Sequence, residues 1–317
     1  MSKNPLKAVD LVELKKITFK PREPLLGPWL HSQDIAMVFA ARGIGKTHFA
    51  LSIAHAVATG SSFLGWSAPS PKRVVYLDGE LPGVVMQQRA SMHMSGVEPE
   101  PGYFRVFTPD LPCMEGQLLP DISTVQGQTD INEMIGVDTD LVIIDNLSAW
   151  ARTGRENDAE SWDQTATWLM SLRRRGIAVL IVHHAGKGGQ QRGTSKREDL
   201  LDVVIKLSRP GDYVPSSGAV FTVEFSKARN LTGNDLQGLE VTLSGTSDRA
   251  EWSYKSVDSS RRHQIIELLK GGHTQSEAAE ILGLDKSTVS RHARAAREDG
   301  SLTANQALGR PVTGLSF

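Results

Sequence analysis

The sequence predicts an α/β fold, a mostly parallel sheet flanked by helices, followed by a small all-α domain. Short, nearly continuous apolar runs, among them Ile35 to Phe39 and Leu141 to Ile144, are separated by segments with helical period. Such runs are typical of parallel strands that helices bury on both faces. The last strand-like run ends near residue 243, and three short amphipathic segments follow after residue 260. With 317 residues, of which 39% are hydrophobic, the chain can bury one large core and a smaller second one.

The charge balance excludes a protein that is basic over its whole surface. The 35 basic and 36 acidic residues give a formal charge of -1, so any surface that binds nucleic acid must be local. Cys113 is the only cysteine, which excludes an intrachain disulfide and fits a reducing compartment. Because we find no secretion signal and no apolar run of about 18 residues, we expect a cytoplasmic protein with no membrane partner.

Composition and pattern divide the chain into four predicted parts. These are an N-terminal extension (1–24), an α/β domain (25–250), a polar linker (251–260) and a helical domain (261–317). Near the start of the α/β domain, Trp29 and Leu30 stand in a proline-rich segment and are expected to pack on the domain that follows. Residues 109–127 are rich in Pro and Gly without a period, which predicts a surface loop.

A glycine-rich loop near the start of the α/β domain gives the strongest chemical signal. The segment Ala40-Ala-Arg-Gly-Ile-Gly-Lys-Thr47 joins an apolar strand to a helix that begins at Lys46. This is the pattern of a P-loop, whose backbone N–H groups cradle phosphates while the Lys reaches the β- and γ-phosphates and the Thr hydroxyl ligates Mg²⁺. We therefore expect ATP and Mg²⁺ as ligands, with the nucleotide held by Ala41, Arg42, Gly43, Ile44, Gly45, Lys46, Thr47 and His48.

One residue departs from the P-loop pattern. Ala40 stands where the pattern has its first glycine, a position that needs a small residue more than a positive φ. The alternative interpretation is a chance Gly-Lys-Thr at a helix start, and the matching strand and helix patterns on either side argue against it.

Two further predicted strands end in carboxylates. The run from Arg73 ends in Asp78 and Glu80, and the run Leu141 to Ile144 ends in Asp145. Because the carboxyl ends of parallel strands meet at one edge of the sheet, these acids should lie beside the P-loop. Asp145 then matches a Walker B carboxylate and should support Mg²⁺ together with Thr47. Glu80 is the candidate base for the attacking water, and its alternative role is to cap the helix that begins near Pro82.

The strand Ile177 to Val182 ends in two histidines, His183 and His184. Successive side chains of a strand point to opposite faces, so only one of the pair can face the cleft. We prefer His184 as a sensor of the γ-phosphate, the alternative being a structural histidine. Metal binding by the pair is not expected, since adjacent residues point apart and no Cys or acid cluster joins them.

Basic residues follow several strands of the predicted sheet. Arg152, Arg155, Lys187 and Arg192 suit contacts with single-stranded DNA. For Arg152 and Arg155, solvated loop charges are the alternative. A later strand, Ala219 to Phe225, runs into Lys227 and Arg229. Two residues apart on a strand end, these side chains should project to the same side. A solvated basic strand end is the alternative to a functional role for this pair.

The helical domain has the spacings of a helix-turn-helix. Small Ala279, the turn residue Gly283 and apolar Val289 fall where two helices cross closely. The third helix, Lys286 to Glu298, turns polar and basic side chains outward. These suit phosphates and base edges of DNA, and the candidates are Lys286, Ser290, Arg291, Arg294 and Arg297. A three-helix bundle without DNA binding remains the alternative.

In this order, the P-loop, the acidic strand tips, the His-His strand end and the Lys-x-Arg pair resemble the RecA-like ATPases, and most closely the plasmid RepA hexameric helicase group. The resemblance covers about residues 25–250. It implies that Lys46 and Thr47 hold phosphate and Mg²⁺. It also implies that Asp145 supports the metal, that Glu80 activates water and that His184 senses the nucleotide.

The resemblance also implies an oligomer. Lys227 and Arg229 match the family's intersubunit pair, which enters the nucleotide site of a neighbouring subunit. The sequence therefore predicts a Mg²⁺-dependent ATPase that acts on DNA, either as a RepA-like replicative helicase or as a DNA-remodelling motor of a plasmid, phage or mobile element. The resemblance implies a homo-oligomer, by the family's pattern a hexamer. The appended helix-turn-helix is not part of the compact RepA pattern. The first alternative is an ATP-controlled DNA-binding regulator of transcription or replication, and the second is an ATPase that remodels protein partners.

Overall fold

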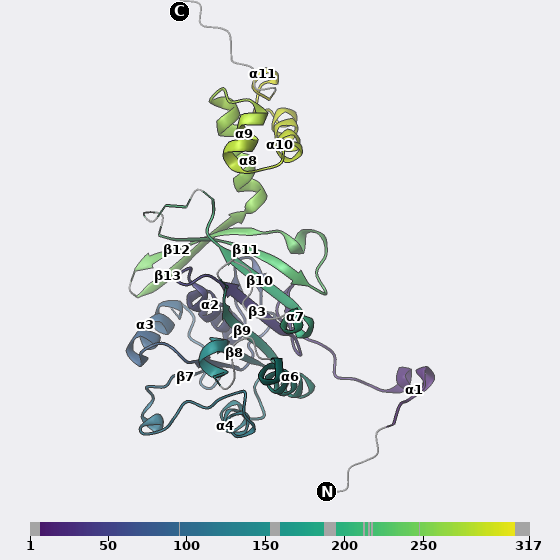
Figure 1. Ribbon diagram of the computed structural model, residues 1–317, viewed down its shortest axis with the longest axis vertical. Coiled ribbons are helices and arrows are strands. Elements are labelled where there is room, and N and C mark those ends of the chain that lie inside the picture. Colours follow the sequence, from purple (N-terminus) through teal and green to yellow (C-terminus); the bar gives the residue numbers. More distant parts are fainter. Residues whose placement is uncertain are drawn as a thin grey trace, which may run out of the picture.

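A computed structural model describes residues 7–94, 96–152, 159–186, 195–211, 213–214, 216, 218–246 and 248–307 of the chain. Its centre is a nine-stranded sheet in the order β13-β12-β11-β10-β3-β9-β8-β6-β7 (Figure 1). Neighbouring strands from β10 to β7 pair in parallel: β10 (Val203–Ser208), β3 (Ile35–Ala40), β9 (Ala178–His184), β8 (Leu141–Asp145), β6 (Val74–Asp78) and β7 (Phe104–Phe107). The mostly parallel sheet that the sequence predicts is confirmed.

Helices cover both faces of the parallel strands. Along β3, Ala36 and Val38 pack toward α2 (Lys46–Thr59), whereas Met37 and Phe39 pack toward α6 (Ala159–Arg174) on the other face. The same two layers contain α3 (Gly83–His93) on the first face, and α4 (Val125–Ile135) and α5 (Leu147–Trp150) on the second. Burial on both faces explains why these strands read as continuous apolar runs.

Short elements complete the α/β domain. Trp29 and Leu30 are buried, as predicted, and the Trp29 ring meets Trp66 edge-on at 5.6 Å. The remaining elements of this part are α1 (Leu11–Lys16), β1 (Pro24–Leu26), β2 (Leu30–His31), β4 (Ser62–Phe63), β5 (Trp66–Ser67), η1 (Pro112–Met114), α7 (Ser195–Leu200) and η3 (Gly233–Leu236). None of the described helices is both long and apolar enough to span a membrane.

Two boundaries differ from the predicted ones. The predicted linker 251–260 is wrong, because β11 (Ala219–Ala228), β12 (Leu239–Thr246) and β13 (Arg249–Ser256) form an antiparallel ribbon at the sheet edge. An edge strand exposes polar side chains, so its composition resembles that of a linker. The predicted loop 109–127 ends early, because the Thr124 hydroxyl accepts a hydrogen bond from the Gly127 N–H (3.1 Å) and caps α4.

The C-terminal helices have a core of their own. The domain consists of α8 (Val257–Lys270), α9 (Gln275–Leu282), α10 (Lys286–Glu298) and α11 (Ala304–Ala307). Thr274 and Glu277 form a capping box at the start of α9, and Gly283 ends the helix with φ of 60°. Ala279 and Val289 are buried where α9 and α10 meet. The predicted helix-turn-helix is confirmed.

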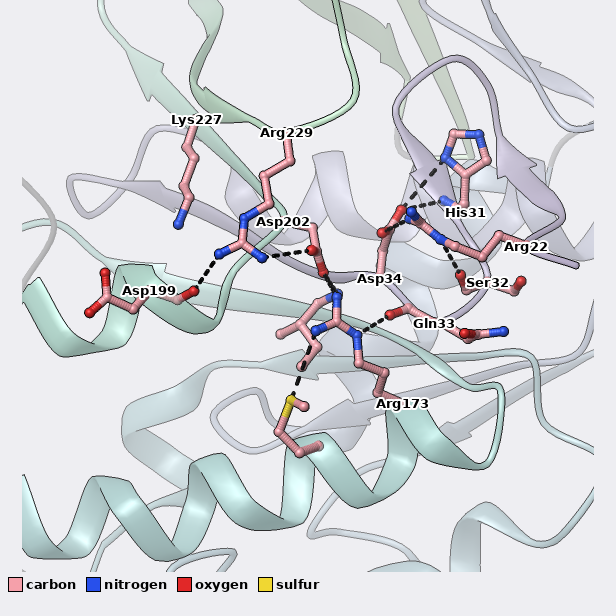
Figure 2. A network of polar contacts seen from close by, with 12 residues as sticks. Arg22, His31, Ser32, Gln33, Asp34, Arg173, Asp199, Asp202, Lys227 and Arg229 are labelled. Atoms are coloured by element: carbon pink, nitrogen blue, oxygen red, sulfur yellow. Dashed lines mark hydrogen bonds and ion pairs between the residues drawn. The ribbon is translucent and has the colours of Figure 1, made fainter. Parts of the chain in front are cut away.

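Two buried carboxylates, Asp34 and Asp202, tie the amino ends of the strands together (Figure 2). Asp202 accepts hydrogen bonds from the backbone N–H of Ile35 (3.0 Å) and from Arg173, and its Oδ1 lies 3.4 Å from the Arg229 guanidinium. Burial raises the pKa of Asp34, while the His31 N–H and the Arg22 guanidinium act in the opposite direction. The network joins β3, β10, the end of β11 and the last turn of α6.

Asp202→Ala should lower the free energy of unfolding by about 3 kcal/mol, because it leaves the buried Ile35 N–H without its acceptor and removes the carboxylate that pairs with the Arg173 guanidinium. Thermal and urea unfolding measure the change. As a matched control, Asp235→Ala in the exposed η3 turn should stay within about 0.5 kcal/mol of the wild type. Equal stability of the two variants would contradict the anchoring role.

Candidate nucleotide site

The register of the parallel strands brings the predicted polar strand ends to one edge of the sheet. Ala40 at the end of β3 lies opposite His184 of β9, and Asp145 of β8 lies opposite Asp78 of β6. A pocket of about 710 Å³ opens at this edge. Its lining contains most of the predicted site: Arg42, Gly43, Ile44, Gly45, Lys46, Thr47, His48, Glu80, Asp145 and His184. The remaining lining residues are Leu81, Arg89, Asn146, Ala219 and Leu243, and the predicted Ala41 is not part of the lining.

The P-loop has the backbone that a phosphate cradle requires. Gly43 and Gly45 have φ of 74° and 118°, in the left-handed region that favours glycine. Gly45 is also the N-cap of α2 and has no side chain to occupy the first-turn amides, so these N–H groups remain donors for an anion. The Lys46 ammonium donates to the carbonyls of Ala40 (3.1 Å) and Ala41 (2.9 Å). Burial lowers the pKa of Lys46, and the carboxylates of Asp145 and Glu80 oppose that shift.

Asp145 and Thr47 provide oxygen donors beside the P-loop. The Asp145 carboxylate is only 6% exposed and accepts hydrogen bonds from the Tyr76 hydroxyl (2.6 Å) and from Thr47. Burial raises the pKa of Asp145, while these two hydrogen bonds oppose that change. A carboxylate and a hydroxyl in contact are oxygen ligands that Mg²⁺ accepts together with phosphate and water. The donor set therefore fits the expected metal.

Glu80 faces the same pocket from the tip of β6. Its Oε1 lies 3.7 Å from Nε2 of His184, and Asn146 Nδ2 approaches the same His184 nitrogen at 3.2 Å. Burial lowers the pKa of His184, and so does nearby Lys46, whereas Glu80 raises it. As alternation predicts, His184 lines the pocket, while His183 is fully buried.

The geometry does not favour the alternative role of Glu80 as a cap of α3. The Gly83 N–H in the first turn of α3 donates instead to Asp110 Oδ2 at 2.7 Å. Asp78 accepts weak hydrogen bonds from the backbone N–H groups of Glu80 (3.3 Å) and Leu81 (3.2 Å), and burial raises the pKa of Asp78 to about 6. Asp78 thus fixes the backbone that follows β6, and the Glu80 side chain lines the pocket.

Sequence reasoning missed five residues that line the pocket, of which two have polar side chains, Asn146 and Arg89. Asn146 directly follows Asp145, so its place at a strand tip was readable from the sequence. Arg89 lies in α3, and its position depends on how that helix packs over the loop, which no local pattern reveals.

Comparisons with known proteins agree with this geometry. A model of the AAA domain family matches residues 2–190, more than half of the chain, and a homeodomain-like domain model matches residues 256–305. The chain belongs to the AAA domain family. This AAA-domain protein is thus a P-loop ATPase with a C-terminal helix-turn-helix DNA-binding domain.

Among solved structures, the crystal structure of the RadB recombinase is similar to this AAA-domain protein. The two share 16% sequence identity at a TM-score of 0.46, over 67% of this chain and 88% of the RadB chain. A comparison with the curated proteins finds no match. None of these findings names the RepA helicase group, so helicase activity and a plasmid origin stay predictions.

The predicted intersubunit pair lies at the opposite end of the sheet from the pocket. Because β11 runs antiparallel to β10, it begins near the pocket at Ala219 and ends near Asp202. There Lys227 donates to the carbonyl of Glu198. Arg229 donates to the carbonyl of Asp199 at 2.7 Å, as Figure 2 shows. The two side chains share one side of the strand, as predicted, and neither lines the nucleotide pocket of its own chain.

The predicted DNA contacts fall into two groups. Arg152 lies on a loop, where its guanidinium donates to the carbonyl of Leu119, and its role stays a prediction. Arg155, Lys187 and Arg192 lie outside the described residues. On α10, Val289, Ala293 and Ala296 face the core, and the predicted contacts are exposed on the outer face: Lys286, Ser290, Arg291, Arg294 and Arg297.

Gly79→Ala should lower kcat for ATP by about 10²-fold while nucleotide binding persists. A Cβ on Gly79 would lie 2.7 Å from the Cβ of Ala149 and 2.9 Å from Nε1 of Trp150, so the tip that carries Glu80 must shift. Misplacement by about 1 Å is enough for such a loss. Steady-state ATPase assays measure it, with Gly211→Ala as control because a Cβ added there would have no atom within 4 Å. An unchanged kcat would show that the position of this tip does not limit hydrolysis.

Proposed function

We propose that this AAA-domain ATPase is a cytoplasmic homo-oligomer, by its resemblance a hexamer, that hydrolyses ATP with Mg²⁺ and drives a DNA-directed motor. A replicative helicase of a plasmid, phage or mobile element is the activity we favour. The observation that carries the ATPase part of the proposal is the pocket that gathers Lys46, Asp145 and Glu80 around the P-loop. Phosphoryl transfer demands positioning and charge neutralisation, and these side chains supply both.

Each side chain has one role in this proposal. The amides of the P-loop and Lys46 bind the phosphates, and Thr47 with Asp145 holds Mg²⁺, which neutralises charge on the transferred phosphoryl group. Glu80 orients and deprotonates the attacking water. His184 lies 3.7 Å from Glu80, so a contact between His184 and a bound γ-phosphate would change the position of the Glu80 carboxylate. No covalent intermediate is needed.

Glu80→Gln should bind ATP normally and hydrolyse it about 10²–10⁴-fold more slowly, because an amide cannot accept the proton of water. Lys46→Ala should lose both tight binding and hydrolysis while the fold persists, since the hydrogen bonds that its ammonium makes to the described residues go to two loop carbonyls. Nucleotide titration and phosphate release separate the two outcomes. Glu133→Gln on the exposed face of α4 is the control. Near-normal turnover of the Glu80 variant would remove it from the mechanism.

The place of Lys227 and Arg229 supports a role in a neighbouring subunit. They lie at the end of β11 that is remote from their own P-loop, and their backbone supports, Glu198 and Asp199, belong to α7. A cation supplied in trans is worth about 10³–10⁵ in rate in other phosphoryl-transfer enzymes. We assign the pair to the γ-phosphate bound by the next subunit.

Arg229→Ala should bind ATP and fail to hydrolyse it. Mixing it with Glu80→Gln should restore part of the activity, because some interfaces then combine an intact Glu80 with an intact neighbouring Arg229. ATPase rates across a mixing series, with mass measurement of the assembly, test this. Two inactive variants that co-assemble and recover no activity would rule out the trans role.

The exposed basic face of α10 supports duplex binding, and we assign single-strand contacts to Arg152, Arg155, Lys187 and Arg192. Phosphate contacts release counterions, so affinity should fall steeply with salt. Contacts near base edges then provide sequence preference.

Arg294→Ala combined with Arg297→Ala should lower the salt slope of duplex affinity by about 0.9 for each phosphate that the variant no longer neutralises, and leave single-strand affinity unchanged. Binding titrations of the full chain at several salt concentrations measure both. Lys255→Ala, an exposed residue of β13, should leave the slope unchanged. A slope that does not respond to the α10 variant would mean that α10 is not the reader.

A second function, ATP-controlled DNA binding, is favoured by one observation: β13 passes into α8 without an intervening loop. A motor should hydrolyse ATP faster with single strands and unwind a forked duplex. A regulator should respond to a particular duplex site and unwind nothing.

A further inference from the structure

β13 connects the ATPase sheet directly to the helix-turn-helix domain. Its last residue, Ser256, is also the N-cap of α8, where its hydroxyl accepts a hydrogen bond from the Ser259 N–H at 3.0 Å. The next residue, Val257, is buried, and its N–H donates to the carbonyl of Gly238 at 2.8 Å. Because α9 and α10 pack on α8, a displacement of β13 is passed to the DNA-binding helices.

Trp252 anchors β13 to the nucleotide-binding half of the domain. Its neighbours Glu251 and Ser253 are exposed, as expected on an edge strand, whereas the indole turns inward. It stacks on His93 at 6.1 Å and 24°, and it meets the rings of Phe63 (5.2 Å) and Phe221 (6.0 Å) edge-on. A displacement of any of these rings would therefore displace β13, the strand that leads into α8.

His93 links Trp252 to the wall of the nucleotide pocket. It is buried at the end of α3, where its Nε2 lies 2.9 Å from Nδ1 of His48 and its Nδ1 lies 3.0 Å from the Ser52 hydroxyl. Burial lowers the pKa of His93 to about 3, so the ring is neutral and has one N–H and one lone pair. It must donate to one neighbour and accept from the other, so a change at His48 is transmitted to Ser52 and to the ring that stacks on Trp252.

A second contact reaches Trp252 from the P-loop itself. A Cβ added to Gly45 would lie 3.4 Å from the Phe221 ring, so this ring lies beside the loop. Phe221 in turn contacts Trp252. His48 and Gly45 flank Lys46 and Thr47 in the sequence, and both line the pocket. Two independent routes from the phosphate cradle thus converge on one indole.

We propose that Trp252 transmits the occupancy of the nucleotide pocket to the helix-turn-helix domain, through His48–His93 and Gly45–Phe221, so that nucleotide changes the affinity of the chain for duplex DNA. The proposal rests on the nucleotide and DNA binding proposed above and adds the route between the two sites. Nothing in it depends on the number of subunits. By linkage, duplex DNA must change nucleotide affinity by the same factor.

The test uses the full chain and a fluorescent duplex of mixed sequence, titrated without nucleotide, with saturating ADP and with a non-hydrolysable ATP analogue. In the wild type, one of the nucleotides should shift the duplex Kd by about fivefold or more, the lower end of couplings between protein sites. Trp252→Leu and His93→Gln should bring the ratio of the duplex Kd with nucleotide to the duplex Kd without nucleotide to about 1. Trp252→Phe, which keeps a stacking ring, should retain it.

His55→Gln is the matched control, because His55 also lies in α2 but its ring contacts the Val97 carbonyl at 2.6 Å, away from the pocket lining. It should keep the wild-type ratio. Amide hydrogen exchange of α8 gives a second readout that needs no DNA: ADP should change exchange in the wild type and in His55→Gln but not in Trp252→Leu. If Trp252→Leu loses its cooperative melt, His93→Gln and Trp252→Phe carry the test.

The failures are distinguishable. If the wild type binds nucleotide and duplex but its duplex Kd is the same with and without nucleotide, the coupling is overturned. The proposed ATPase and the DNA-binding domain are then unaffected. A wild-type ratio in folded Trp252→Leu or His93→Gln overturns the route. A wild type that binds no nucleotide overturns the proposed function together with the coupling.

Discussion

The constraint on which the nucleotide site depends is the parallel pairing of buried strands. The backbone N–H and C=O groups of β3, β9, β8 and β6 have no access to water, so each must find its partner across the sheet. That pairing fixes Ala40 opposite His184 and Asp145 opposite Asp78. A slip of one residue would turn apolar side chains into the pocket and a carboxylate into the core. The row of polar strand ends is therefore a result of backbone hydrogen bonding.

The two ends of the sheet have different chemistry. At the carboxyl end, glycines with left-handed φ and the start of α2 present amide donors, and Asp145 is held by Tyr76 and Thr47. At the amino end, Asp202 gathers Arg173 and Arg229 around the first residues of β3. One chain thus presents its phosphate cradle and the Lys227–Arg229 pair at opposite ends of the sheet. In the proposed oligomer this separation lets each subunit complete the site of the next.

The antiparallel ribbon has a second use beyond closing the sheet. Its outermost strand, β13, is polar on its exposed side and anchored by Trp252 on the other, and it ends where α8 begins. The aromatic cluster that anchors it includes Phe221, whose ring lies beside Gly45 of the P-loop. The packing that stabilises the sheet edge is thus the same packing that places the DNA-binding helices relative to the nucleotide.

The sequence by itself determined the features that depend on short-range spacing. The P-loop, the acidic tips at Asp78 and Asp145 and the turn at Gly283 each follow from a few adjacent residues, because local backbone conformation and strand alternation are set by near neighbours. Only the tertiary structure decided that residues 249–256 are a strand, since a polar segment becomes a strand through a partner such as β12. It also decided that Arg89 lines the pocket and that His93 meets Trp252. Contacts between residues far apart in the chain depend on how whole elements pack, and no local pattern encodes that packing.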